Sequence, residues 1–339
     1  MAAHRDTAMP TRRRALTIFG ALAGLPLVGL GLPGRAKADV QLFTWEGTAL
    51  GADSSITLAH TSREAAQKII DLAVAEVERL EAIFSLHRPD SELARLNANG
   101  LLARPSTDML FLLTEAKRYG DISNGAFDVT VQPLWALYSD HFRRDPKDET
   151  GPAANDIKKA LALIDYRRID VNPLFVALDR KGMGVTLDGI AQGYITDRVS
   201  ELLRSHNVTN VLVNLGETRA LDQHPEGRPW RIALKDPRDP QRTEQTIDLS
   251  NMAVATSGGY GTVFDGEGRF HHLFDPRTGK SAAQHIGVSI VTPRATQADA
   301  LSTAIYVSPA SETQRILSRA GNATAHVTYP DGSRRTFRA

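Results

Sequence analysis

A carboxylate and a hydroxyl stand four residues apart in segment 295–304, which reads ATQADALSTA. If this segment begins a helix, Asp299 and Thr303 project from the same helix face. Hard oxygen ligands at that spacing suit Mg²⁺, which takes one or two carboxylates and leaves room for water and a substrate phosphate. The same spacing also fits a threonine that hydrogen-bonds back to its own helix beside a solvated aspartate. Taken alone, the pair does not decide between the two interpretations.

Two other segments would complete a metal-dependent site if the fold brought them together. In 186–197 (TLDGIAQGYITD) we expect a strand to end in an acid-glycine turn before a helix, which exposes backbone carbonyls to cations. Ordinary helix capping by Asp188 explains the same residues. In 271–279 (HHLFDPRTG) we expect a strand that ends in a proline turn. Beside a metal at Asp299, His272 becomes a candidate general base, although paired histidines also fit an exposed strand.

Two remaining segments are richer in small and polar residues than packing requires. Segment 123–135 (SNGAFDVTVQPLW) is typical of a turn that leads into a strand and stops at a proline. Segment 214–217 (NLGE) closes a strand with a turn glycine, and each segment also fits a plain loop. Serine hydrolase chemistry is disfavoured, because no G-x-S-x-G elbow occurs and Ser257 has no base beside it in the sequence.

The composition excludes several classes of protein. The 339 residues are 42% apolar and 23% charged, which is typical of a globular chain. With 40 Lys and Arg against 39 Asp and Glu, the formal charge of +1 gives no support to a nucleic-acid-binding surface. The absence of cysteine excludes disulfides, thiolate metal sites and cysteine nucleophiles, so any metal must be bound by oxygen or histidine.

The first 38 residues are typical of an export signal. Residues 11–14 (TRRR) precede the uncharged run 15–32, and 36–38 (AKA) supply the small-x-small pattern that signal peptidases cut. Paired arginines before a weakly apolar run resemble the twin-arginine signals of bacteria, which export folded proteins. A membrane anchor is the alternative, but four glycines and a proline make the run a poor helix at the short limit of a span. We therefore expect 1–38 to be cleaved and a single domain, 39–339, to act in the periplasm.

The elements that must position these groups follow from periodicity. Apolar residues recur with a period near 3.6 over Ser62–Phe84, which predicts a long amphipathic helix, and alternation predicts a hairpin over 39–60. The charged segment 143–156 has no periodicity and is expected to be a loop. The remaining predictions are strands near 169–179, 211–215, 230–235, 286–292 and 324–329, and helices near 107–119, 189–205, 296–307 and 311–319. This order predicts an α+β fold, and residues 39–339 contain neither a G-x-G-x-x-G fingerprint nor a Walker loop.

Taken together, these segments resemble the ApbE family of FAD:protein FMN transferases over about residues 45–310. Six motifs carry the resemblance: RPDSEL with LN in 88–97, GAFDVT in 125–130, IAQGY in 190–194, ATSG in 255–258, HLFDPRTG in 272–279 and ADALSTA in 298–304. The resemblance implies an α+β fold of two intertwined subdomains. It also implies that FAD binds in the cleft between them, with Mg²⁺ at its diphosphate.

The reaction that the resemblance implies is a phosphoryl-type transfer. A threonine hydroxyl of a client protein attacks the FMN-side phosphorus of FAD, AMP leaves, and FMN stays attached through a phosphoester. A cation held by Asp299, Thr303 and a turn carbonyl at Gly189 is the main device expected, because such transfer depends on neutralising phosphate oxygens. His272 would accept the threonine proton or orient the nucleophile, which makes His272 and Asp299 the expected catalytic residues. By their places in the motifs, the residues expected to contact FAD are Leu50, His87, Ala126, Phe127, Asp128, Thr186, Gln192 and Phe274.

Five positions depart from the residues usual in the family. Thr186 replaces an aspartate, Asp188 a serine or glycine, Gln192 a lysine or glutamate, His87 a tyrosine, and Leu215 stands where a Gly-Gly pair is usual. The twin-arginine leader is similar to that of members which serve nitrous-oxide respiration. The resemblance therefore implies a client with a Ser/Thr-Gly-Ala-Thr-type acceptor, a membrane-bound flavoprotein regulator.

Two other functions would use the same site. An FAD pyrophosphatase would let water replace the threonine and release both FMN and AMP. A periplasmic FAD carrier or assembly factor would bind the nucleotide without reacting, and the departures at 186, 188 and 192 keep that alternative open.

Overall fold

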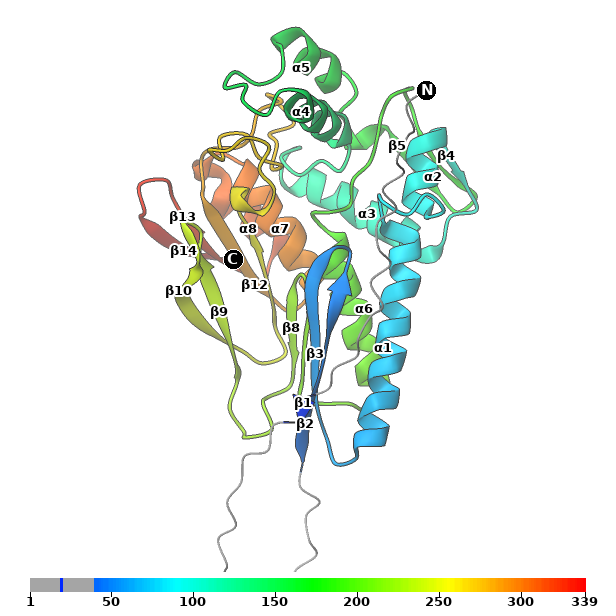
Figure 1. Ribbon diagram of the computed structural model, residues 1–339, viewed down its shortest axis with the longest axis vertical. Helices are drawn as coiled ribbons and strands as arrows, with labels where there is room; N and C mark the ends of the chain where they lie inside the picture. Colours follow the sequence, from blue (N-terminus) through cyan, green and yellow to red (C-terminus); the bar gives the residue numbers. More distant parts are fainter. Residues whose placement is uncertain (1–18, 21–39) are drawn as a thin grey trace, which may run out of the picture.

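A nine-stranded antiparallel sheet forms the centre of the protein (Figure 1). The computed structural model describes residues 19–20 and 40–339, so the predicted leader, 1–38, lies outside the described residues except for the short strand β1. No helix in the described part of the chain is long and apolar enough to cross a membrane. In spatial order the strands are β1 (Phe19–Gly20), β2 (Gln41–Ala49), β3 (Ala52–His60), β7 (Val211–Leu215), β8 (Thr218–Leu221), β11 (Ala253–Ser257), β12 (Gly287–Thr292), β13 (Thr324–Thr328) and β14 (Arg334–Arg338).

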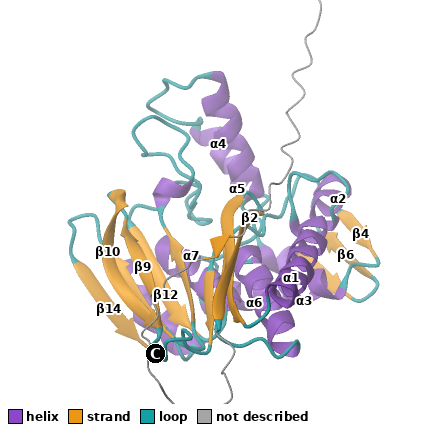
Figure 2. Cartoon of the chain, turned by 60° about the horizontal axis from the view of Figure 1, so that its bottom comes forward, coloured by secondary structure: helices purple, strands orange, loops and turns teal. Residues whose placement is uncertain are grey.

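Three helices cover one face of this sheet. Helix α1 (Arg63–Phe84) lies over β2 and β3, α6 (Ala191–Ser205) over β7 and β8, and α7 (Ala295–Val307) over β11 and β12. Figure 2 shows α7, α6 and α1 in a row. Successive residues of a strand point to opposite faces, so Val213 of β7 joins the main core under the helices, whereas Leu212 faces away from it.

The opposite face is covered by a long hairpin of β9 (Trp230–Asp236) and β10 (Asp239–Leu249). Trp230 and Leu249 of this hairpin pack against Val254 of β11 in a second apolar core. The central strands are therefore buried on both faces.

The remaining elements lie around the helical layer, and α8 (Thr313–Ala320) packs against β14. A three-stranded sheet has the order β4 (Leu101–Ala103), β6 (Phe175–Leu178), β5 (Ile169–Asn172). Figure 1 shows α4 and α5 together at the top of the molecule. The other helices are α2 (Glu92–Asn99), α3 (Thr107–Ile122), α4 (Gln132–Arg144), α5 (Ala154–Leu161) and α8 (Thr313–Ala320), with short 3-10 turns at Tyr166–Arg168, Gly259–Gly261 and Ala310–Glu312.

The predictions for the longest elements are confirmed. The hairpin of β2 and β3 spans 41–60, and α1 begins after Ser62, whose Oγ accepts a hydrogen bond from the Ala65 N–H. Helices and antiparallel sheets occur together without a regular parallel alternation, so the α+β prediction is also confirmed.

The strand predicted within 123–135 is wrong. Residues 123–131 form turns, and α4 begins at Gln132 with Pro133 in its first turn, where proline sacrifices no intrahelical hydrogen bond. The buried side chains of this helix, Leu134, Tyr138 and Phe142, recur every four residues. That spacing is a helical signal which the proline obscured.

Three smaller predictions also need correction. The predicted loop 143–156 is shorter, because α4 ends at Arg144 and α5 begins at Ala154. No strand leads directly into the turn at Asp188. Instead, the Asn97 side-chain amide donates to the Val185 C=O and accepts from the Val185 N–H, at 2.7 Å each, as a neighbouring strand would. The segment at His271 is a loop with isolated bridges and not a strand.

Candidate active site

A cavity of about 550 Å³ is lined by the start of α6, one face of α7, the turns before α4 and the loop that follows β11. Every residue to which the sequence assigned a role in the site lines this cavity, although these residues come from segments spread over the chain. They are Leu50, His87, Ala126, Phe127, Asp128, Thr186, Gly189, Gln192, His272, Phe274, Asp299 and Thr303. The structure therefore brings them together, and the roles assigned to them stay predictions.

Asp299 and Thr303 share the face of α7 that lines the cavity, as their spacing predicts. Asp299 is 3% exposed, and its Oδ2 accepts a hydrogen bond of 2.9 Å from the backbone N–H of Gly193 at the start of α6. Within the described part of the chain, this is the one donor to the carboxylate, which leaves Oδ1 available to a ligand. The hydroxyl of Thr303 lies 3.2 Å from the Ser257 hydroxyl of β11.

Gly189 brings a backbone turn close to the Thr303 side chain. A Cβ atom at Gly189 would lie 3.1 Å from Thr303 Oγ1 and 3.3 Å from the Phe127 ring, so glycine permits the close approach. Among the described residues, no three His, Cys, Asp or Glu side chains gather as a metal site. A carboxylate, a hydroxyl and a carbonyl are nevertheless the hard oxygen donors that Mg²⁺ accepts when water and phosphate complete its shell. The residues present fit that ion.

Two buried acidic side chains, Asp299 and Glu217, line the cavity. Burial raises the pKa of Asp299, and the nearby Asp188 and Asp197 raise it further, against the hydrogen bond from Gly193. Burial and the Asp299 carboxylate also hold the pKa of Glu217 well above its usual range. A cation bound among these groups would favour their ionised forms.

Glu217 is a site residue that sequence reasoning missed. It follows the turn glycine between β7 and β8, is 9% exposed and lines the cavity. The NLGE segment stands out in the sequence only for its small and polar residues, and nothing in the sequence indicates that its acid faces Asp299. Tyr260, which also lines the cavity, was missed for the same reason.

The two adjacent histidines have different surroundings. His271 is buried, its Nε2 lies 3.0 Å from the Ala282 carbonyl and its Nδ1 accepts from the Leu273 N–H, so both ring nitrogens are used inside the protein. Burial lowers the pKa of His271 to about 4. His272 lines the cavity, and its Nδ1 lies 3.2 Å from the Thr262 carbonyl. Only the tautomer with a proton on Nδ1 can donate to that carbonyl, which leaves the Nε2 lone pair free.

Burial also lowers the pKa of His272, against the hydrogen bond to Thr262 and the charge of Asp188. The imidazole of His272 is therefore neutral at neutral pH and able to accept a proton. Of the two histidines, only His272 combines a place in the cavity with a free nitrogen.

The residues expected to contact FAD include buried aromatic rings and a carboxylate that is hydrogen-bonded within the protein. Phe127 and Phe274 are buried rings, and Phe274 packs on Tyr138 at 4.8 Å between centroids. The Asp128 carboxylate accepts from the N–H and hydroxyl of Thr130 and from the Tyr166 N–H, so it holds the turn that shapes the cavity.

Gln192 and Leu50 lie where the backbone is constrained, by a close approach at Gln192 and by a positive φ at Leu50. A Cβ atom at Gly216 would come within 2.7 Å of the Gln192 side chain, so this glycine makes room for the amide. Leu50 has a positive φ of 45° in the β2–β3 turn, where its N–H donates to Glu81 at 2.8 Å.

Comparison with known proteins agrees with the motifs. The model of the ApbE family matches residues 50–327, which is most of the chain. The chain belongs to the ApbE family. The resemblance drawn from the six sequence motifs is confirmed, and five of the six contribute residues to the lining of the cavity just described.

Relatives within the ApbE family cover most of the chain. A Haemophilus influenzae protein named FAD:protein FMN transferase is 34% identical over 265 residues, 75% of each chain. A Vibrio cholerae protein of the same name is 32% identical over 240 residues, 68% of this chain and 70% of its own. The crystal structure of the Pseudomonas stutzeri flavinyl transferase ApbE in its apo form is 27% identical and superposes with a TM-score of 0.75, covering 88% of this chain and 95% of its own. The ApbE protein of Thermotoga maritima, also 27% identical, gives 0.76 over 88% and 97%.

Proposed function

We propose that this protein is an FAD:protein FMN transferase that moves FMN from FAD to a threonine hydroxyl of a client protein in a Mg²⁺-dependent reaction. The observation that carries the proposal is that five of the six family motifs line one cavity, where hard oxygen donors accompany a histidine whose Nε2 is free. The activity named for the relatives supports the same conclusion.

The transfer makes one bond and breaks one bond at phosphorus. The client's threonine oxygen forms a bond to the FMN-side phosphorus, and the bond from that phosphorus to the bridging oxygen breaks, so AMP leaves with the bridging oxygen. The threonine proton passes to Nε2 of His272, which is neutral and held in the required tautomer by its bond to Thr262. The product carries FMN through a phosphoester.

The metal would be held by Asp299, Thr303 and the Gly189 carbonyl. When bound, Mg²⁺ supplies positive charge to the diphosphate oxygens and so stabilises the charge that develops on the departing phosphate. The protein's own part is to fix these donors, two on one face of α7 and one in the turn before α6, and to bury the Asp299 carboxylate. Ala126, Phe127 and Phe274 provide apolar surface for the ring systems of FAD, with Leu50, His87, Asp128, Thr186 and Gln192 around the rest of the nucleotide.

Intact mass spectrometry tests this function. The purified protein is incubated with FAD, Mg²⁺ and a client fragment that bears a Ser/Thr-Gly-Ala-Thr-type acceptor. We expect the fragment to gain the mass of FMN less one water, and a fragment with alanine at the acceptor threonine to gain nothing. Free FMN and AMP without a mass gain would establish the pyrophosphatase instead, and FAD recovered bound and unchanged would establish a binding protein.

The location and the client are further parts of the proposal. The twin-arginine pattern at 11–14 supports export of the folded protein to the periplasm, and the resemblance to members serving nitrous-oxide respiration supports a membrane-bound flavoprotein regulator as client. Replacing Arg12 and Arg13 by lysine should leave the protein in the cytoplasm and its client without FMN. Unchanged export of this double variant would contradict the twin-arginine assignment.

A further inference from the structure

Helices α6 and α7 each begin without a side-chain cap of their own. Helix α6 starts after Ile190 and α7 after Arg294, and neither residue makes a capping hydrogen bond. The first N–H groups of a helix lack partners within the helix, and leaving them unpaired in a buried place costs stability. Each of these two helices finds its missing acceptor on the other one.

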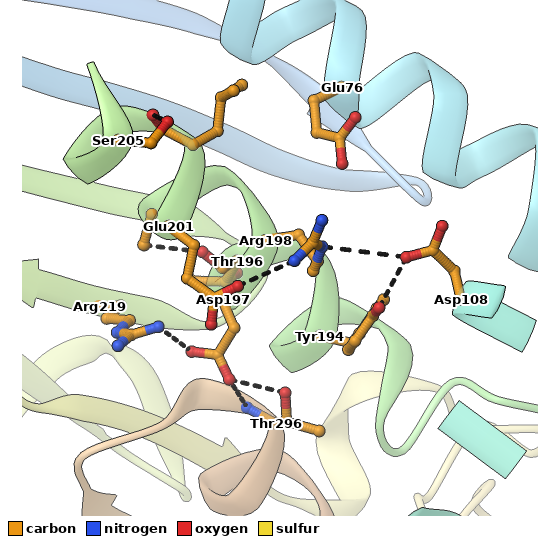
Figure 3. A network of polar contacts seen from close by, with 12 residues as sticks. Glu76, Asp108, Tyr194, Thr196, Asp197, Arg198, Glu201, Ser205, Arg219 and Thr296 are labelled. Carbon is orange, nitrogen blue, oxygen red and sulfur yellow. Dashed lines mark hydrogen bonds and ion pairs between the residues drawn. The ribbon is translucent and has the colours of Figure 1, made fainter. Parts of the chain in front are cut away.

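The cap of α7 comes from Asp197 in the middle of α6. Its Oδ1 accepts from the Ala295 N–H at 2.8 Å, and its Oδ2 accepts from the N–H and hydroxyl of Thr296 at 3.0 and 2.6 Å. The buried guanidinium of Arg219, on β8, donates to Oδ1 at 2.7 Å and balances the charge (Figure 3). Asp197 is 4% exposed.

The cap of α6 comes from Asp299 of α7, through its bond to the Gly193 N–H. The two aspartates therefore tie the helices together in both directions, and Gly193 permits the contact, since a Cβ there would lie 2.4 Å from the Ala295 carbonyl oxygen. The proposed metal donors are divided between these two parts, with Gly189 just before α6 and Asp299 and Thr303 on α7. The separation of the helices sets the distance between the donors.

We propose that Asp197 is a positioning residue for the metal site, which caps α7 so that Asp299 and Thr303 face the Gly189 carbonyl at the spacing that Mg²⁺ requires. This inference rests on the proposed function. Mg²⁺ demands nearly ideal octahedral geometry at short distances, so a small rotation or shift of α7 lowers its affinity. Residues that orient metal ligands typically change affinity by about 10- to 100-fold when they are replaced.

Asp197→Asn is the first test, because an amide cannot accept all four hydrogen bonds and carries no charge opposite Arg219. Titration of the purified protein with Mg²⁺ alone in a calorimeter should give a dissociation constant raised about 10-fold or more. The rate of FMN transfer should return to the wild-type value at saturating Mg²⁺. An unchanged Mg²⁺ dissociation constant, or a rate that saturating Mg²⁺ does not restore, would overturn the inference.

Asp108→Asn is the matched control. Asp108, on α3, holds α6 from its other side by accepting from the Tyr194 hydroxyl at 2.7 Å (Figure 3). It also accepts from Arg79 of α1 at 2.7 Å, and its described polar contacts do not include α7. Its replacement should lower thermal stability and leave the Mg²⁺ dissociation constant within twofold of the wild type. An equal loss of Mg²⁺ affinity in both variants would show that general loosening of α6, and not the cap, is responsible.

Thr296→Val covers the case in which Asp197→Asn does not fold. Valine removes only the hydroxyl that donates to Asp197 and preserves the shape, so we expect Mg²⁺ affinity to fall by about fivefold, the effect of one hydrogen bond. No change in affinity would again refute the positioning role. If the wild-type protein itself bound no Mg²⁺ and transferred no FMN, the proposed function would fail, whereas wild-type binding with unaffected variants would remove only this inference.

Discussion

Gly193 is the position at which one added methyl group should disturb both the fold and the proposed metal site. With the backbone held in place, the Cβ of Gly193→Ala would lie 2.4 Å from the Ala295 carbonyl oxygen, 2.7 Å from its carbonyl carbon and 2.8 Å from the Asp299 Cβ. Two carbon atoms attract each other at separations of about 3.5 Å or more, so α6 and α7 must move apart by roughly 0.8 Å. Two of these atoms belong to the backbone and cannot turn aside.

The cost follows from this overlap. Overpacking of a buried site costs about 1–3 kcal/mol, and the backbone contacts place Gly193→Ala at the upper end, about 3 kcal/mol. At about 2 °C per kcal/mol for a large domain, the melting temperature should fall by about 6 °C. The same separation moves Asp299 away from Gly189, which should weaken Mg²⁺ binding by at least about tenfold.

Differential scanning calorimetry and Mg²⁺ titration measure the two effects. Gly266→Ala is the matched control, because a Cβ there meets nothing within 4 Å and the backbone is not in the left-handed region. It should change the free energy of unfolding by no more than about 0.5 kcal/mol. A Gly193→Ala protein with wild-type melting temperature and wild-type Mg²⁺ affinity would refute the close-packed arrangement of the two helices.

The other predictions concern the charged groups of the site. Asp299→Ala should abolish FMN transfer while circular dichroism shows an intact fold, and excess chelator should stop the wild-type enzyme; full transfer in either experiment would remove the metal assignment. His272→Ala should slow transfer about 100-fold and leave FAD affinity nearly unchanged, and an equal loss of both would indicate a binding role. Since burial lowers the pKa of His272, wild-type transfer should decline only as the pH falls below the ordinary histidine value of about 6.5. His271 has a pKa of about 4 in the folded protein, so the proton binds the unfolded chain first, and the free energy of unfolding should fall by about 3 kcal/mol between pH 6.5 and pH 4. A His271→Gln variant with the same pH dependence of unfolding as the wild type would contradict that assignment.

Much of the fold was predictable because it depends on local pattern. The helix α1 has a regular apolar period and a serine cap, and the β2–β3 hairpin alternates between faces. Helix α4 was not predicted, because a proline in a first turn resembles a proline that ends a strand and obscured the four-residue spacing of Leu134, Tyr138 and Phe142, which are buried in the aromatic core. Side-chain amides that replace a strand, as Asn97 does for Val185, leave no periodic signal at all.

The sequence by itself determined the chemical types of the site residues and their local spacing. Asp299 and Thr303 share a helix face because four residues make about one helical turn. Gly189 has no side chain, so it permits a close approach of the backbone to neighbouring groups. The order of the motifs was sufficient to indicate the ApbE family.

Only the tertiary structure decided which of these residues meet. The bond from Gly193 to Asp299 joins positions 106 residues apart, and no local pattern specifies a contact at that separation. The fold also decided that His272, and not His271, has a free nitrogen in the cavity, and that Glu217 lies beside Asp299. The physical reason is that burial and partner geometry are properties of packed elements, whereas spacing along the chain fixes only the neighbours within one helix or strand.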